Sequence, residues 1–240
     1  MAEQSMKMCW NSYQTPSVRI PLKEEFVTFI RQTTFWGRDT YVSCSYRKVD
    51  EQKLIDEAEK KVKVAAENLS NEWNKKSGEL MDSIKMTIGN LIADAEQKDS
   101  DAKLDADGLR RILGEVLASM SNSTVMNIKD LANNVIGRIM DIAQNCNVSL
   151  SNIGKVDETT AKNKIYTRAS DIRHKVESGL RDLFDEFNTD IKNELCKSKN
   201  EVVNIFTSRK NELITKAKGS VKDYIDSLEK DLKDKKAQLE

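Results

Sequence analysis

Apolar residues recur at helical spacing along most of this 240-residue chain. From Asp50 they return about every 3.7 residues, allowing one polar step near Lys76, so they share one face of a helix of roughly 45 residues. These positions are Leu54, Ala58, Val62, Ala65, Leu69, Trp73, Leu80, Ile84, Ile88, Leu91 and Ala95. We predict one long amphipathic helix that ends in the polar segment from Lys98 to Gly108, where the chain should turn.

The next apolar stripe predicts two shorter helices. One runs from Leu109 to about Met120 and the other from Val125 to Ala143, and Ser121 to Thr124 between them are typical of an N-cap or a brief irregularity. The inward positions are Ile112, Leu113, Val116, Leu117, Ile128, Leu131, Val135, Ile139 and Ile142. A second turn is expected from Asn145 to Gly154.

The last stripe is the longest. It comprises Ile165, Ala169, Ile172, Val176, Leu180, Leu183, Phe187, Ile191, Leu195, Val202, Phe206, Leu213, Ala217, Val221, Leu228 and Leu232. The mean spacing between these apolar positions is again about 3.7 residues. A leucine zipper has a mean spacing of about 3.5 residues, so a simple zipper is not expected. Roughly 75 helical residues would extend on the order of 110 Å.

The two long stripes, joined by a shorter helical segment, can bury each other as antiparallel neighbours in a three- or four-helix bundle. The absence of proline after residue 48 supports long helices, because proline interrupts a helix interior. We therefore predict an all-α fold, an elongated antiparallel helical bundle over residues 49–240.

Residues 1–48 form a separate, aromatic-rich segment that holds both prolines, Pro16 and Pro21. Pro21 can open a short helix capped by Gly37. Its apolar face would consist of Leu22, Phe26, Phe29 and Ile30. From Thr40 to Val49, apolar and polar residues alternate, which indicates a strand that would need a partner.

Lys plus Arg and Asp plus Glu both number 39, so the chain has no net charge to attract nucleic acid. Charged residues make up 32% and hydrophobic residues 38%, which suits narrow helical seams. The first residues do not resemble a signal peptide, and no apolar run reaches the ~18 residues of a membrane span. We expect a cytoplasmic protein, with peripheral membrane attachment as an option.

Candidate chemistry is sparse. Four cysteines lie far apart beside a single histidine, His174, so we expect free thiols and no zinc site. The turn from Lys103 to Gly108 resembles a calcium loop, but it begins with a lysine and has Gly114 where a glutamate is needed. Phosphate-binding loops, nucleophile elbows and H-E-x-x-H pairs are missing from the sequence. We therefore expect no enzyme activity, no cofactor, no metal and no small-molecule substrate.

One local cluster suggests a contact surface. Its members are Arg31, Phe35, Trp36, Arg38 and Tyr41. Aromatic rings beside arginines suit a membrane interface, and residues 1–48 carry seven basic and four acidic side chains, a net charge of +3. The alternative is that Phe35 and Trp36 pack the short helix onto the bundle.

The passage from Phe35 through Tyr46-Arg47-Lys48 into a long helix resembles the tip and trunk of bacterial dynamin-like GTPases. The last helix, ending at Leu228 to Leu232, would correspond to the returning trunk helix of that family. The resemblance implies membrane binding through Phe35 and Trp36 and self-assembly through helix faces. It implies no hydrolysis by this chain, because the GTPase domain is absent.

The leading hypothesis is a non-enzymatic, stalk-like helical module for protein–protein assembly, with a membrane surface as a second candidate partner. One alternative is a helical toxin or pore-forming component, although the longest charge-free runs, such as Val116 to Ile128, are rich in polar residues. Another is a coiled-coil scaffold or adaptor with no membrane role.

Overall fold

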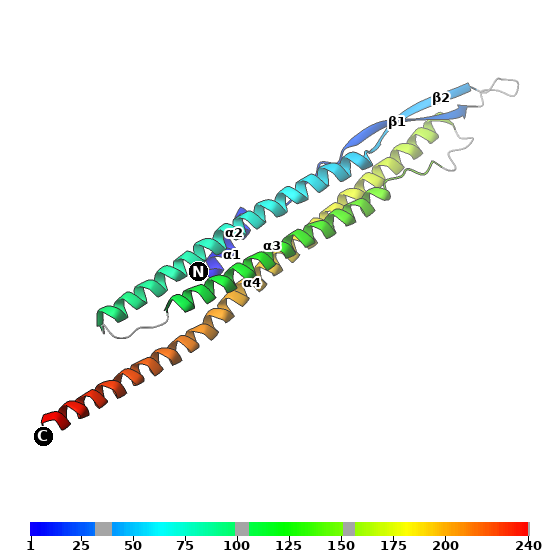
Figure 1. Cartoon of the computed structure of the whole chain (residues 1–240). Coiled ribbons are helices and arrows are strands. Elements are labelled where there is room, and N and C mark those ends of the chain that lie inside the picture. Colours follow the sequence, from blue (N-terminus) through cyan, green and yellow to red (C-terminus); the bar gives the residue numbers. More distant parts are fainter. Residues whose placement is uncertain (32–39, 99–105, 151–156, 240) are drawn as a thin grey trace. The chain divides into compact units, whose positions relative to one another are not determined.

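The structure is a computed structural model that describes residues 1–31, 40–98, 106–150 and 157–239. These residues form α1 (Ala2–Ser12), β1 (Leu22–Arg31), β2 (Thr40–Val49), α2 (Glu51–Lys98), α3 (Ala106–Gln144) and α4 (Glu158–Leu239), as Figure 1 shows. The prediction of a mostly helical fold with long packed helices is confirmed, and a two-stranded sheet lies near the N-terminus.

α2 begins where the sequence predicts, and α4 begins at Glu158, seven residues before the first position of its predicted stripe. The Asp50 carboxylate accepts a hydrogen bond from the Lys53 N–H at 3.4 Å at the start of α2. At the start of α4, the Asp157 carboxylate accepts from the Thr160 N–H at 3.0 Å. Hydrogen bonds from Thr160 lower the pKa of Asp157 below its ordinary value. Each aspartate is therefore an N-cap that satisfies a backbone donor with no partner inside the helix.

The predicted break at 121–124 is wrong, because α3 is one continuous helix of 39 residues. The apolar stripe of α3 continues through Ser121 and Thr124, which are both buried. The Thr124 hydroxyl donates to the Met120 carbonyl at 3.0 Å, and Ser121 donates to the Asn74 side chain at 2.9 Å. Small hydroxyl residues can occupy core positions of a helix when such bonds satisfy them.

The short helix predicted from Pro21 is also wrong, because residues 22–31 are a strand. β1 pairs antiparallel with β2, from Leu22 opposite Val49 to Arg31 opposite Thr40. The apolar spacing of this segment fits a helix and a strand alike, and the partner strand decides in favour of the strand. The strand predicted at Thr40–Val49 is confirmed with the same bounds, and β1 is the partner that it required. Gly37, the predicted helix cap, lies outside the described residues.

The helix α1 has no counterpart among the predicted elements. Its residue Cys9 is fully buried, and the Met6 sulfur lies 3.6 Å from the Cys196 sulfur of α4. The Lys192 ammonium stands 5.8 Å from the centre of the Trp10 ring. At the start of α1, Ala2 packs against a core cluster that contains Leu80 and Val202. α1 therefore contacts both α2 and α4.

The chain forms two compact units, and each long helix contributes a segment to both. Unit 1 comprises Met1–Ser12, Leu69–Asn127 and Lys192–Glu240, and unit 2 comprises Tyr13–Asn68 and Ile128–Ile191. Unit 1 therefore contains α1, and unit 2 contains the β1–β2 hairpin. The aromatic-rich residues 1–48 are divided between the two units.

Within the units, α3 is antiparallel to both other long helices. In unit 1, Asn74 of α2 accepts a hydrogen bond from Ser121 of α3, and Met81 of α2 lies beside Gly114 of α3. In unit 2, Arg138 of α3 forms an ion pair with Glu186 of α4 at 2.7 Å. A further contact in unit 2 places Ile142 of α3 beside Gly179 of α4, so residue numbers rise in one helix as they fall in the other. The antiparallel bundle is confirmed, because α3 runs opposite to both α2 and α4. The prediction that the two long stripes are antiparallel to each other is wrong, because α3 is long enough to return the chain and α2 and α4 then run in the same direction.

Candidate functional site

The β1–β2 hairpin has one face packed on the bundle. Val27, Phe29 and Tyr46 lie in a core cluster with Ala161 and Ile165 of α4. The Tyr166 hydroxyl of α4 also donates to the Ser45 carbonyl at 2.8 Å. This packing explains why a two-stranded sheet, which is marginal by itself, is stable in this protein.

Glu25 is the centre of a charged network on the hairpin. Its carboxylate accepts a hydrogen bond from the Tyr46 hydroxyl at 3.2 Å and pairs with the Lys48 ammonium at 2.8 Å. The hydrogen bond from Lys48 lowers the pKa of Glu25 and raises the pKa of Lys48. Burial, followed by the Glu25 charge, raises the pKa of Tyr46. These groups hold the two strands together.

The other face of the hairpin exposes aromatic residues. Phe26 is 72% exposed and Tyr41 is 73% exposed, one on each strand. Between them, the hydroxyls of Thr28 and Ser43 lie 3.0 Å apart. This face presents two rings and small hydroxyls to its surroundings, a composition suited to contact with a partner or a lipid interface.

Of the five residues in the predicted contact cluster, the structure describes two. Tyr41 lies on the exposed face of β2, and Arg31 is the last residue of β1, with its backbone paired to Thr40. The side chain of Arg31 and all of Phe35, Trp36 and Arg38 lie outside the described residues. Phe26 was missed, because the helix prediction placed it on a buried face. The run Phe26-Val27-Thr28-Phe29-Ile30 has strong strand propensity, and this signal could have identified it.

A second exposed apolar surface lies near the end of α4, within unit 1. Ile225 is 49%, Leu228 is 44% and Leu232 is 70% exposed. Every residue between 212 and 236 whose side chain the structure describes is exposed, whereas Val202 earlier on the same helix is buried. The apolar stripe of α4 therefore continues past the buried part of the helix into a part where its apolar side chains are exposed. We call Ile225, Leu228 and Leu232 the α4 stripe.

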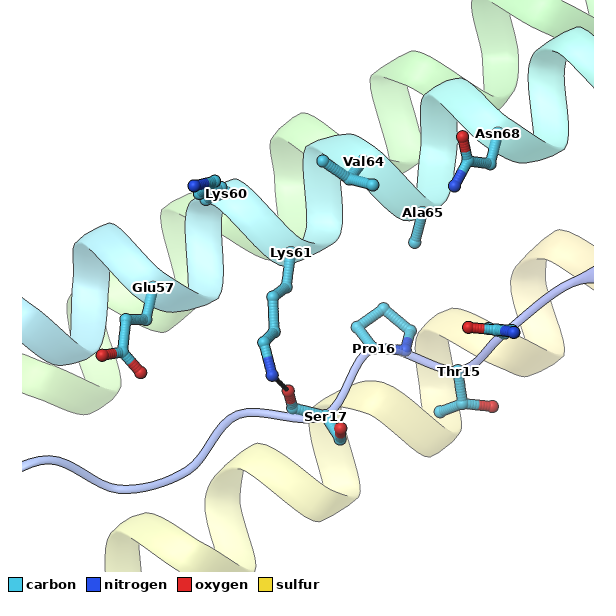
Figure 2. A pocket seen from close by; sticks show the side chains of 10 residues that line it. Thr15, Pro16, Ser17, Glu57, Lys60, Lys61, Val64, Ala65 and Asn68 are labelled. Atoms are coloured by element: carbon cyan, nitrogen blue, oxygen red, sulfur yellow. Dashed lines mark hydrogen bonds between the residues drawn. The ribbon is translucent and has the colours of Figure 1, made fainter.

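A hollow of about 460 Å³ in unit 2 lies between the segment before β1 and α2, as shown in Figure 2. The Lys61 side chain reaches across from α2, and its ammonium donates to the Ser17 carbonyl at 2.5 Å (Figure 2). Pro16 of the segment is buried, and Glu57 and Lys60 line the hollow from α2, as Lys61 does. The lysine ties the segment to α2, and the mixed charges of this hollow define no particular ligand.

A narrower groove of about 310 Å³ lies within unit 1, between α2, α3 and α4. Apolar side chains dominate its lining, including Ile84, Ile88, Leu113 and Phe206. Met1 also borders it, so the groove begins where α1 begins. Its apolar character is that of an incompletely covered core.

The cysteines are poor candidates for chemistry. Cys9, Cys44 and Cys146 are buried, Cys196 is half-buried, and all four are free thiols. Burial raises the pKa of Cys9 to about 12 and that of Cys146 to about 11, so both are protonated at neutral pH and weak nucleophiles.

Metal ligands and histidine chemistry are equally sparse in the part of the chain that the structure describes. It holds no cluster of three His, Cys, Asp or Glu side chains that could bind a metal. As predicted, His174 is exposed, and its Nδ1 lies 3.6 Å from a Glu177 carboxylate oxygen. The described helices include none that is both long and apolar enough to cross a membrane.

Over the described ranges, the structure consists of three long helices, a short N-terminal helix and a β-hairpin packed on α4, and apolar side chains are exposed on the hairpin and near the end of α4. Comparison with protein families, curated proteins and solved structures found no match to this chain.

Proposed function

We propose that this protein is a non-enzymatic, stalk-like helical module that assembles with other protein chains through the α4 stripe. The observation that carries this proposal is the exposure of Ile225, Leu228 and Leu232 on a helix whose earlier stripe is buried. Isolated apolar side chains are ordinary on a protein surface, but these three follow one another at spacings of three and four residues. An amphipathic helix of this kind gains stability when another chain covers its apolar side.

The composition of this region supports a protein partner. Charged residues of both signs surround the stripe, including Lys222, Asp226, Glu229 and Lys233. Mixed charges beside a narrow apolar seam are typical of helix–helix association, where the seam provides affinity and the flanks provide specificity.

The test is the solution mass of the full chain across a wide range of concentration, by sedimentation or light scattering. We expect a mass that rises with concentration. Leu228→Asp should weaken association by at least about a hundredfold, because it places a charge in the apolar seam. Ser227→Asp is the matched control, since Ser227 is exposed beside the stripe and not part of it. A monomer at every concentration, or equal association by both variants, would reject the proposal.

We propose a membrane surface as a second partner, contacted by the exposed face of the hairpin. The supporting observation is the exposure of Phe26 and Tyr41 on the hairpin. Residues 1–48, which include most of the hairpin, carry seven basic and four acidic residues, a net charge of +3. Aromatic rings favour the headgroup level of a bilayer, and cations favour anionic lipids. A relationship to the tip of the bacterial dynamin-like GTPases is part of this hypothesis.

Flotation with vesicles that contain anionic lipid tests the membrane proposal. The double variant Phe26→Ser and Tyr41→Ser should move the protein from the floated to the soluble fraction, and Phe35→Ala with Trp36→Ala should act in the same direction. The control is Met86→Ser with Met126→Ser, because both methionines are 65% exposed but lie on the bundle. If the wild type does not float, or if all these variants float as it does, the membrane contact is wrong.

A further inference from the structure

The α4 stripe has the spacing of a coiled-coil seam. Ile225, Leu228 and Leu232 are separated by three and then four residues. The same spacing occurs earlier on α4, at Leu180, Leu183 and Phe187, where the side chains are buried. The side chains of the α4 stripe are exposed, so this seam is available to a second helix.

The charges beside the stripe are ordered. Lys222 and Glu229 are seven residues apart, so they occupy the same side of the seam in successive heptads. Both side chains are exposed. Asp223 and Lys230 are also exposed and seven residues apart, but they lie on the opposite side of the helix. The flank nearest the stripe carries the exposed Lys222 and Glu229 and, one heptad further on, the exposed Lys236.

We propose that a second copy of this chain binds the α4 stripe in the antiparallel direction. With Ile225 opposite the partner's Leu228, residue numbers fall along the partner as they rise along α4. Lys222 then lies beside the partner's Glu229, and Glu229 beside the partner's Lys222. These two contacts are equivalent because the pair has two-fold symmetry. This inference rests on the proposed assembly function and adds its partner and register.

Charge complementarity is the reason for this orientation. An antiparallel pair places opposite charges together on the flank, whereas a parallel, in-register pair separates Lys222 from the partner's Glu229 by about two helical turns. Opposite charges across a seam set partner choice and direction more than they add affinity. The apolar residues are the same in either arrangement, so the flank decides between them.

The experiment uses two full-length single variants, Lys222→Glu and Glu229→Lys. Alone, each places like charges together twice, and we expect association about tenfold weaker than that of the wild type at low salt. Mixed in equal amounts, the two variants should recover association, because the mixed pair has opposite charges at both contacts. Asp223→Lys and Lys230→Glu make the same charge changes on the opposite side of the helix, and neither their separate nor their mixed samples should differ from the wild type.

Three other outcomes would reject the antiparallel pairing, and each points to a different reason. If Leu228→Asp abolishes association but mixing restores nothing, the antiparallel register is wrong and the assembly function stands. If the control pair also recovers on mixing, general charge attraction accounts for the effect, and the specific contact is wrong. If the wild type is monomeric throughout, the assembly function and the inference both fail. Circular dichroism of every variant confirms that helix content is unchanged.

Discussion

At the scale of single residues, Glu25 connects the two strands of the hairpin to each other. Its carboxylate pairs with Lys48 from β2 and accepts from the buried Tyr46, with Lys23 at 3.6 Å on its own strand. The pKa of Glu25 is lower in the folded protein than its ordinary value. Its stabilising effect is therefore present above the unfolded-state pKa and is lost as the pH falls through the folded-state pKa. The pKa of Lys48 is raised, so its contribution persists until the pH rises through that higher value.

We predict that Glu25→Gln lowers the free energy of unfolding at neutral pH by less than about 1 kcal/mol, because the side chain is one-third exposed and solvent screens the pair. The difference from the wild type should disappear at an acidic pH below the lowered folded-state pKa of Glu25, where the wild-type carboxyl is also protonated. Urea unfolding at the two pH values measures this. Glu24→Gln is the control, since Glu24 is exposed and lies on the other face of β1. An undiminished difference at low pH would show that charge is not the cause.

At the scale of elements, the two ends of the chain contribute differently to unit 1. α1 buries Cys9, and its residues Met6 and Trp10 contact Cys196 and Lys192 of α4. Near the other end, every described side chain from 222 to 236 is exposed. Burial of apolar surface is the main favourable term in folding, so α1 should matter to stability and the last turns of α4 should not.

We predict that deleting residues 1–12 lowers the free energy of unfolding by about 2–5 kcal/mol, because the deletion uncovers buried side chains. Deleting residues 223–240 should change it by less than about 1 kcal/mol. Denaturant unfolding of both truncated chains, at concentrations where the protein is a monomer, makes the comparison. Equal losses from the two deletions would contradict this account of α1.

The strand β1 shows why one element could not be predicted from local pattern alone. Leu22, Phe26 and Phe29 satisfy the spacing of a helix face, yet Val27 and Phe29 are the residues packed on α4, and Phe26 is exposed. A short apolar run fits both periods, and only the distant pairing with β2 decides between them. The strand β2 was predictable because Val42, Cys44 and Tyr46 alternate strictly with polar residues.

At the scale of the whole molecule, the balance of charge limits the kinds of partner. The 39 basic and 39 acidic side chains leave no net charge, and no global field favours a polyanion. We predict no retardation of duplex DNA or RNA in a gel-shift assay at low salt, where electrostatic binding is strongest. A basic protein of similar size serves as the positive control. Salt-sensitive retardation by this chain would show that a local basic surface outweighs the neutral total.

The sequence by itself determined the long helices and most of their buried positions. Their stripes persist over many turns, and the starts of α2 and α4 carry the capping residues Asp50 and Asp157. Local pattern suffices for such elements, because the period of a long helix repeats often enough to exclude a strand. The free thiols and the exposed His174 followed from composition and spacing in the same way.

Only the tertiary structure decided the hairpin, the continuity of α3, the position of α1 and the direction of the helices. Each depends on a partner outside the element itself: β2 for β1, Asn74 for the buried Ser121, and Cys196 for Met6. The α4 stripe belongs to the same group. Its residues have the same apolar pattern as the buried part of the helix, and they are exposed because no other segment among the described residues packs against them. The amphipathic pattern shows which face of a helix is apolar and is stabilised by burial. The tertiary structure decides whether a segment of this chain or a partner chain covers that face.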